Sequence, residues 1–195
     1  MAAAMSEKIW DLPIMHRLFI GLRPPPAIRQ ILLAAMSGVP AARWQTDDQL
    51  HLTLRFVGEV ATPMAEEIAL ALARLHAPAP EARIEGVGRF ERDGRTDTLW
   101  AGVAPAAPLA GLHRKVDRAL VGLGLPADTR SYLPHITLAR LPRSQGMGPA
   151  IEGFLAKQAA LASADFIMPH LSLFESILTR DRAVYEVRAR WPLGQ

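Results

Sequence analysis

Two copies of one short motif contain the side chains best suited to chemistry. HLTL at 51–54 recurs 84 residues later as HITL at 135–138. The composition gives about 0.03 His-x-Thr-Leu matches by chance, so two copies indicate a shared role. Imidazole, with an ordinary pKa near ~6.5, can donate or accept a proton at neutral pH. Threonine hydroxyls can donate hydrogen bonds to negatively charged oxygen atoms.

The spacing inside each motif places a histidine and a threonine on one face of a strand, because residues i and i+2 of a strand share a face. His51 lies with Thr53, and His135 with Thr137, while aliphatic residues occupy the other faces. Opening a cyclic phosphate with water needs a base on one side of phosphorus and an acid on the other. Two histidine faces across a groove could supply both, and the threonines could bind the non-bridging oxygens. The predicted site needs no metal ion or other cofactor.

The elements that must position these faces alternate along the chain. Hydrophobic periodicity predicts strands over 17–22, 50–57, 82–90, 98–103, 134–141, 170–178 and 183–191, and helices over 27–36, 62–75, 109–120 and 150–161,. The mixed order with several hairpins favours the α+β class. Each motif is followed by a helix and then a strand pair, which indicates a single domain, 1–195, whose lobes come from related halves, roughly 14–104 and 105–195.

Composition narrows the function classes. The chain has no cysteine, which excludes disulfides, thiolate metal sites and a cysteine nucleophile,. The net charge is +3, and 19 of the 22 basic residues are arginine, a good phosphate ligand,. No apolar run is long enough for a membrane span or a signal peptide. We therefore expect a cytoplasmic protein, acting as a monomer, with no membrane partner.

The motifs and their surroundings resemble a known family, the two-histidine phosphoesterases. Within it the chain is similar to the RNA 2′,3′-cyclic phosphodiesterases, historically called 2′-5′ RNA ligases. The similar segments are RLFIGLRPP, HLTLRFVGEV, LPHITLARL, SLFESIL and YEVRARWPL. The resemblance implies a bilobal α+β fold with two antiparallel sheets, related by a pseudo-twofold axis, that face each other across a central groove. It places the helices on the outside.

The resemblance also implies roles that the nearly symmetric motifs leave open. His51 would be the proton donor to the ribose 3′ oxygen, and His135 the proton acceptor. Thr53, Thr137 and Arg140 would bind the phosphate. The substrate would be RNA with a 2′,3′-cyclic phosphate end, such as tRNA halves or oligonucleotides, and the product a 2′-phosphomonoester. The same site could run in reverse as a 2′-5′ RNA ligase.

Two other functions fit the same motifs. One is a two-histidine phosphodiesterase that acts on a small cyclic nucleotide or on an ADP-ribose cyclic phosphate. The other is a non-catalytic module that binds RNA ends. The first would gain nothing from extra nucleotides on its substrate, and the second would bind cyclic-phosphate ends without consuming them.

A few residues have alternative interpretations. The alternation of the first motif strand places Arg55 on the His51 face, where it could contact phosphate or extend into solvent. Phe56, Phe90 and Trp100 fit the core, although one of them, or Tyr132, could stack on a nucleobase. Residues 1–12 are expected to form a disordered extension.

Overall fold

A computed structural model describes residues 14–179 and 183–194 of the chain, so the extension predicted at residues 1–12 lies outside the described residues. Within these ranges the chain forms four α-helices and nine strands, which confirms the α+β class. In chain order they are β1 (Met15–Leu22), α1 (Pro26–Ala35), β2 (Arg43–Trp44), β3 (Leu52–Ala61), α2 (Thr62–Ala73), β4 (Glu81–Arg92), β5 (Arg95–Ala104), α3 (Ala106–Val121), β6 (His135–Arg140), α4 (Pro149–Gln158), β7 (Phe166–Ile167), β8 (His170–Leu178) and β9 (Ala183–Pro192). The sequence predicted all of these except the two-residue strands β2 and β7.

The strands form one antiparallel sheet in the order β7-β4-β5-β6-β3-β1-β8-β9, with β2 also paired to β6. The resemblance implied two separate sheets, so this expectation needs correction: hydrogen bonding runs across the middle of the molecule. The junction is narrow, because among the described residues β3 pairs with β6 only at Leu52 and Ile136. The sheet therefore has two halves joined at the strands that carry the two motifs.

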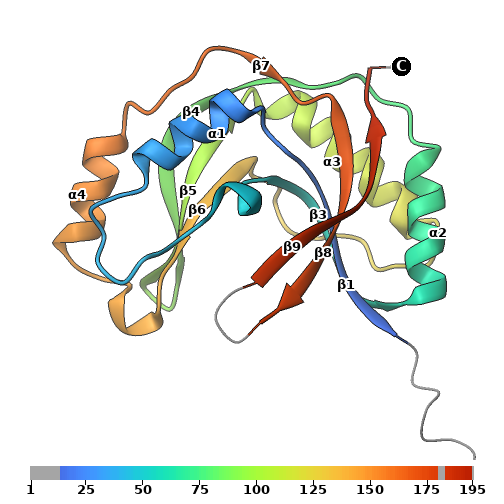
Figure 1. The fold of residues 1–195 in the computed structure, drawn as a ribbon, viewed down its shortest axis with the longest axis horizontal. Helices are drawn as coiled ribbons and strands as arrows, with labels where there is room; N and C mark the ends of the chain where they lie inside the picture. Colours follow the sequence, from blue (N-terminus) through green and yellow to red (C-terminus); the bar gives the residue numbers. More distant parts are fainter. Residues whose placement is uncertain (1–13, 180–182, 195) are drawn as a thin grey trace, which may run out of the picture.

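Each half of the sheet combines strands from both halves of the chain (Figure 1). The hairpin β4–β5 follows the first motif but pairs with β6, the strand of the second motif. The hairpin β8–β9 follows the second motif but pairs with β1, which in turn pairs with β3. This exchange encloses both motif strands between neighbours, so the motifs lie at the centre of the sheet.

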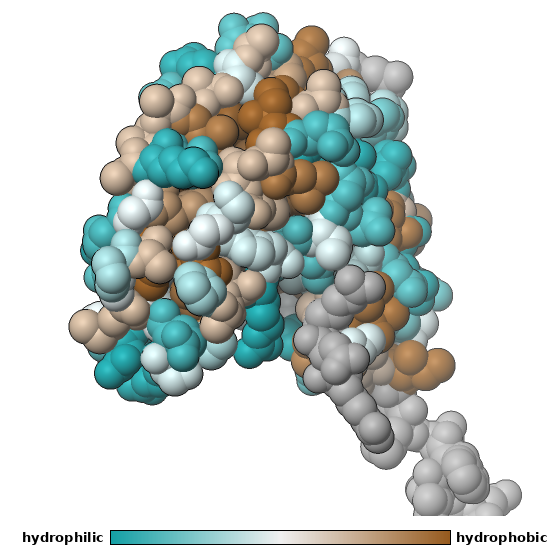
Figure 2. All heavy atoms as spheres, turned by 60° about the vertical axis from the view of Figure 1, so that its left-hand side comes forward, coloured by the Kyte–Doolittle hydropathy of each residue, from teal (hydrophilic) through white to brown (hydrophobic). Residues whose placement is uncertain are grey.

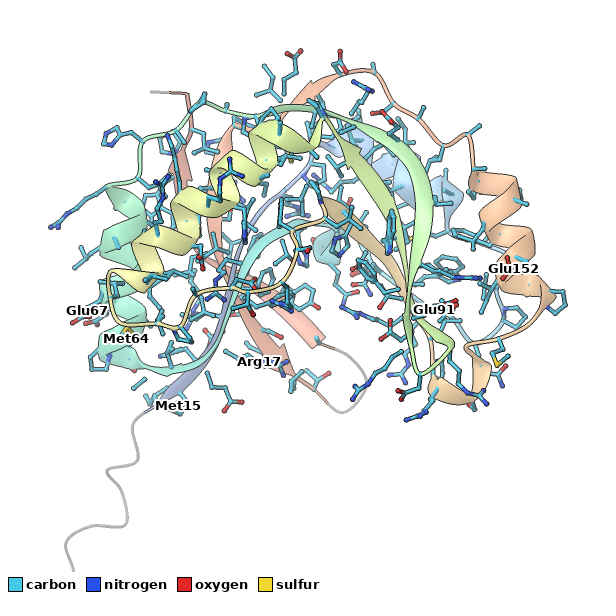
Figure 3. The ribbon with its side chains drawn as sticks, turned by 180° about the vertical axis from the view of Figure 1, so that it is seen from behind. Met15, Arg17, Met64, Glu67, Glu91 and Glu152 are labelled. Atoms are coloured by element: carbon cyan, nitrogen blue, oxygen red, sulfur yellow. The ribbon has the colours of Figure 1, made fainter. Side chains whose placement is uncertain are left out.

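The helices cover the sheet in two pairs. Seen from behind, α3 crosses the sheet with α2 beside it (Figure 3), and both contact β3. On the other half α4 packs against β4, and the Gln158 side chain of α4 donates a hydrogen bond to the Ala35 carbonyl of α1. The aliphatic faces of both motifs lie in the core, since Leu52 and Ile136 are fully buried. The opposite face of each motif strand, which carries the histidine and the threonine, therefore remains available to a ligand.

The outer surface is mixed in character. The face that carries α4 interleaves hydrophilic and hydrophobic side chains (Figure 2). In the described parts of the chain, we find no helix with the length and apolar composition that a membrane crossing requires.

Candidate active site

The two motif histidines have the same hydrogen-bond geometry. The Nδ1 atom of His51 lies 2.7 Å from the Gln49 carbonyl oxygen, and that of His135 lies 2.7 Å from the Leu133 carbonyl oxygen. A carbonyl oxygen only accepts, so Nδ1 carries the hydrogen in both rings. Nε2 is then the atom that gains or loses a proton, and each ring can act as an acid or a base through it.

Aromatic side chains surround both imidazole rings. The ring centroid of His51 lies 4.7 Å from that of Phe19 and 5.1 Å from that of Tyr185, whose ring meets it edge-on. The ring of His135 meets Phe90 edge-on at 4.8 Å. The two histidines are thus held on apolar walls, which restricts their rotation and removes part of their hydration.

This environment makes protonation of both rings less favourable. Burial lowers the pKa of His51 to about 4; its hydrogen bond to Gln49 opposes this shift, and the nearby charges of His135 and Arg140 add to it. Burial also lowers the pKa of His135, opposed by the Leu133 carbonyl and assisted by Arg140. Without a ligand, both rings are therefore neutral at neutral pH. A bound anion would favour the protonated forms.

A glycine makes room for the aromatic wall beside His135. Gly88 of β4 pairs with Trp100 of β5, and a Cβ atom at position 88 would come within 2.2 Å of the indole ring. The indole therefore lies flat over the glycine, with its centroid 6.1 Å from the His135 ring. Any larger residue at position 88 would displace Trp100 from this place.

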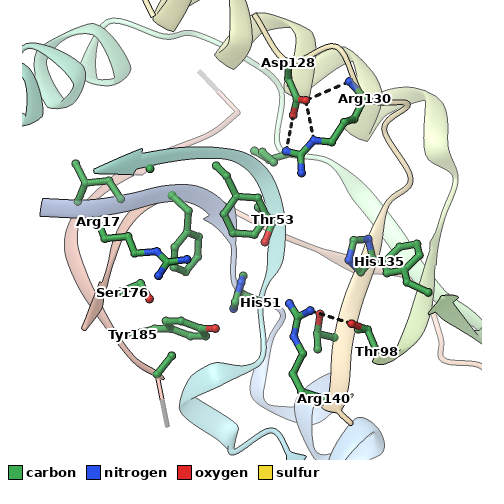
Figure 4. A pocket seen from close by; sticks show the side chains of 18 of the residues that line it. Arg17, His51, Thr53, Thr98, Asp128, Arg130, His135, Arg140, Ser176 and Tyr185 are labelled. Atoms are coloured by element: carbon green, nitrogen blue, oxygen red, sulfur yellow. Dashed lines mark hydrogen bonds and ion pairs between the residues drawn. The ribbon is translucent and has the colours of Figure 1, made fainter. Parts of the chain in front are cut away.

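One pocket, with a volume of about 710 Å³, contains all five residues that the sequence analysis assigned to the site: His51, Thr53, His135, Thr137 and Arg140. Figure 4 shows His51 and His135 on opposite walls, with Arg140 pointing between them. The pairing of β3 with β6 explains this arrangement. Leu52 pairs with Ile136 in antiparallel strands, and each of these residues directly follows its motif histidine, so His51 and His135 lie on either side of this pair,.

Arg140 supplies positive charge at the base of the pocket. Its Nη1 atom donates a hydrogen bond of 2.8 Å to the Thr98 hydroxyl of the neighbouring strand. Within residues 14–179 and 183–194 it forms no ion pair with a carboxylate, so its charge is available to an anionic ligand. The same ranges contain no cluster of three or more His, Asp or Glu side chains arranged to hold a metal ion.

Arg55 does not lie where the sequence placed it. In the pairing of β1 with β3, Gly21 faces Thr53 and Ile20 faces Arg55, so Leu54 is an extra residue in a β-bulge,. The bulge turns Arg55 to the helix side, where its Nε atom donates to the Asp117 carboxylate of α3 at 2.8 Å. Both alternatives for Arg55, phosphate contact and solvent, are wrong.

The same bulge moves Phe56 from the predicted core to the pocket. Its side chain is 48% exposed and lines the cavity. Phe90 lines the cavity too, whereas Trp100 lies behind it. Tyr132 reaches the pocket, but its ring stacks on His113 at 4.4 Å, and its hydroxyl donates to the Thr53 carbonyl at 3.4 Å.

Comparison with known proteins places the chain in a family. A family model described as the 2′-5′ RNA ligase superfamily matches residues 24–179. An RNA 2′,3′-cyclic phosphodiesterase from Aeropyrum pernix is 32% identical over 160 residues, which cover 80% of this chain and 90% of that relative. The chain belongs to the 2′-5′ RNA ligase superfamily.

Two further similar proteins agree with this assignment. An RNA 2′,3′-cyclic phosphodiesterase from Escherichia coli K12 is 27% identical over 184 residues, or 92% of this chain and 98% of that protein. The crystal structure of E. coli LigT complexed with 3′-AMP matches with a TM-score of 0.75 and 25% identity, over 93% of this chain and all of that one. The family predicted from the doubled motif is therefore confirmed.

Sequence reasoning missed several pocket residues of this superfamily member. Phe19 and Tyr185, which pack on His51, come from β1 and β9, and Thr98, which binds Arg140, comes from β5. Only β1 carried a usable signal: alternation over 17–22 places Arg17 and Phe19 on one face. The contributions of β5 and β9 depend on strand pairing that no local pattern reveals.

Proposed function

We propose that the protein hydrolyses RNA 2′,3′-cyclic phosphodiester ends to 2′-phosphomonoesters by metal-free acid–base catalysis. Membership of the superfamily, with RNA 2′,3′-cyclic phosphodiesterases among the similar proteins, supports the class of phosphodiester hydrolase and the RNA-end substrate. The observation that carries this proposal is that His51 and His135, both with Nδ1 bonded to a carbonyl, line one pocket together with the guanidinium of Arg140.

In the proposed reaction, water attacks phosphorus and the bond to the ribose 3′ oxygen breaks. His135, neutral at Nε2, accepts the proton that the water loses. His51, protonated at Nε2, donates a proton to the departing 3′ oxygen. The products are a ribose 3′-hydroxyl and a 2′-phosphate, so each histidine ends in the protonation state in which the other began. Exchange of protons with solvent then restores the starting pair.

The proposed acid must carry a proton although burial lowers its pKa. The pKa of His51 is about 4 without a ligand. A cyclic phosphate carries one negative charge, and an opposite charge within a few ångströms raises the pKa of an imidazole. We infer that the substrate itself promotes the protonation of His51. Arg140 and the hydroxyls of Thr53 and Thr137 would hold the non-bridging oxygens and stabilise the charge that builds on them in the transition state.

We further propose that the motifs are related by a pseudo-twofold axis near the Leu52–Ile136 pair, and that residues 14–104 and 105–195 are repeats within one domain. The exchanged hairpins and the matched Nδ1 bonds support this relationship. The same site also permits ligation: a 5′-hydroxyl replaces water as the nucleophile and gives its proton to His135, the bond from phosphorus to the 3′ oxygen breaks, and a 2′-5′ linkage forms. Water at high concentration favours hydrolysis.

The test is incubation with an oligoribonucleotide that ends in a 2′,3′-cyclic phosphate, followed by identification of the monoester. We expect a 2′-phosphate, produced by the wild-type protein and by the control His170→Ala, whose histidine is exposed and outside the pocket. A 3′-phosphate product would contradict the assignment of the leaving oxygen. Binding of the cyclic end without turnover would contradict the enzyme and favour an RNA-end-binding module.

A further inference from the structure

The pocket extends beyond the residues that the proposed reaction uses. Part of its wall is formed by Arg17 of β1, Phe56 of β3 and Arg130 of the loop after α3, which we call the outer wall. In Figure 4, Arg17 and Arg130 lie around the part of the pocket away from Arg140. Their chemistry, two cations and one exposed aromatic ring, matches the phosphate and base of a nucleotide.

Phe56 presents an aromatic ring where the strand pattern would have buried it. The bulge at Leu54 turns the ring outward, and the ion pair between Arg55 and Asp117 holds that bulge against α3. Phe19 contacts both the His51 ring, at 4.7 Å, and the Phe56 ring, at 5.9 Å. The Phe19 ring therefore connects the Phe56 ring to the imidazole of His51, the proposed acid.

Arg130 lies over Phe56. Its guanidinium carbon is 6.0 Å from the centroid of the ring, at the outer limit of a cation–π contact,. Flat groups in contact lie about 3.5 Å apart, so a base that enters between these two groups must move the exposed Arg130 side chain outward,. Asp128 binds the guanidinium through Nε at 3.0 Å and Nη2 at 3.1 Å, which keeps it beside Phe56.

Arg17 provides a positive charge in addition to that of Arg140, the proposed ligand of the terminal phosphate. It shares the pocket face of β1 with Phe19, and it is exposed,. Across the described ranges it pairs with no carboxylate. A cyclic mononucleotide has one phosphate, which would lie between the histidines. In an RNA substrate, the second anion is the phosphodiester on the 5′ side of the cyclic end.

We propose that the outer wall is a subsite for the nucleotide that precedes the cyclic end, with its base between Phe56 and Arg130 and the connecting phosphodiester at Arg17. This inference rests on the proposed function and gives it a substrate class: oligonucleotides rather than cyclic mononucleotides. Small cyclic nucleotides lack a preceding base and would leave the outer wall unoccupied.

The first test compares kcat/KM for a 2′,3′-cyclic mononucleotide with that for a tetranucleotide with the same 3′ residue. Stacking of one base predicts a preference of roughly tenfold or more for the tetranucleotide. Phe56→Leu and Arg17→Gln should each reduce that ratio to below about threefold, whereas the exposed Arg74→Gln, outside the pocket, should retain it,.

Three outcomes separate the inference from the function on which it rests. Turnover of both substrates with equal efficiency by the wild-type protein would overturn the subsite and leave the function intact. Retention of the preference in both pocket variants would also overturn it. If no cyclic phosphate is consumed, the proposed function fails, and a binding measurement then decides the subsite.

The binding measurement uses fluorescence anisotropy of a labelled tetranucleotide that ends in a 2′-phosphate, at several salt concentrations. Loss of one phosphate contact to single-stranded RNA lowers the slope of log K against log salt by about 0.7. We expect this change for Arg17→Gln and not for Arg74→Gln. An unchanged slope for Arg17→Gln would overturn the assigned phosphate contact.

Discussion

Leu52 and Ile136 form the single backbone pair that joins β3 to β6 within the described residues. Both side chains are fully buried, and each follows a motif histidine directly. The pair therefore fixes the separation of His51 from His135 through two short segments of backbone. Diagonal neighbours in a regular antiparallel pair lie roughly 7–8 Å apart, a span that can hold a phosphate between two imidazoles.

Removal of either imidazole should abolish most of the activity. His51→Ala or His135→Ala is expected to lower kcat by at least ~10²-fold, the usual contribution of one positioned acid or base. Steady-state kinetics on the cyclic-phosphate oligonucleotide checks this, with His170→Ala as the matched histidine control and thermal unfolding as a check on folding. Losses smaller than about threefold in both variants would show that neither ring transfers a proton in the slow step.

The pH dependence should be bell-shaped and should shift when substrate binds. The profile of kcat/KM reports the free protein, in which the pKa of His51 is about 4 and that of His135 is also lowered,. The profile of kcat reports the complex, in which the phosphate charge raises the pKa of His51.

Activity is lost on the alkaline side when the acid loses its proton, so the alkaline limb of kcat should lie at higher pH than that of kcat/KM. Both limbs describe the coupled pair rather than one ring. Coincident alkaline limbs would contradict the effect of substrate charge. A profile that is flat from roughly pH 5 to 9 would contradict acid–base catalysis by histidine.

The proposed hydrogen bonds from the threonine hydroxyls can be tested with substitutions that preserve the shape of the side chain. Thr53→Val and Thr137→Val keep the β-branched side chain but remove the donor. A hydrogen bond to a charged group contributes ~1.5–3 kcal/mol, so each variant should lose about tenfold or more in kcat/KM. Equal catalytic efficiency in wild type and both variants would remove the threonines from the phosphate site.

The buried ion pair between Arg55 and Asp117 should make a large contribution to the free energy of unfolding. The side chains of Arg55 and Asp117 are 9% and 17% exposed, so Arg55→Leu leaves a carboxylate without its partner. We expect a loss of about 3 kcal/mol or more in the free energy of unfolding, measured in urea. The exposed pair of Arg143 and Asp93 is the control, and Arg143→Leu should cost less than ~1 kcal/mol,.

The double variant Arg55→Leu with Asp117→Leu distinguishes pairing from packing. Removal of both charges should recover part of the lost stability, because no unpaired carboxylate remains. If Arg55→Leu costs no more than Arg143→Leu, the bulge does not depend on this pair.

Chelation of divalent ions should leave turnover intact. The proposed steps are two proton transfers between imidazoles, water and a ribose oxygen, and the charge of the phosphate is met by Arg140. Activity measured after dialysis against EDTA should therefore equal that of the untreated protein. Complete loss that a divalent ion restores would require a different mechanism.

The sequence predicted the α+β class and five of the residues that line the pocket, because these depend on local signals. Period-two alternation around His51 and His135 correctly separated the buried Leu52 and Ile136 from the polar faces. Doubling of the motif then predicted that both faces serve one site.

The sequence did not predict the position of Arg55 or Phe56. Alternation assigns faces on the assumption that every residue of a strand is paired, and the unpaired residue at Leu54 reverses the assignments of Arg55 and Phe56 until a second register shift at Val57,. The groups that bind this bulge lie far away in the chain, in Asp117 and His113 of α3. The continuity of the sheet was equally hidden, because the Leu52–Ile136 pair joins segments that share no local pattern.

Phe174 of β8 and Tyr185 of β9 pack against His51, so the environment of this imidazole depends on the last hairpin. A shortened homologue that ended before β8 would still contain both tetrapeptides. It would nevertheless leave the first imidazole more hydrated on that side, with a smaller lowering of its pKa, and would expose an edge of β1. Recognition of functional relatives should therefore demand an intact C-terminal hairpin as well as the two motifs.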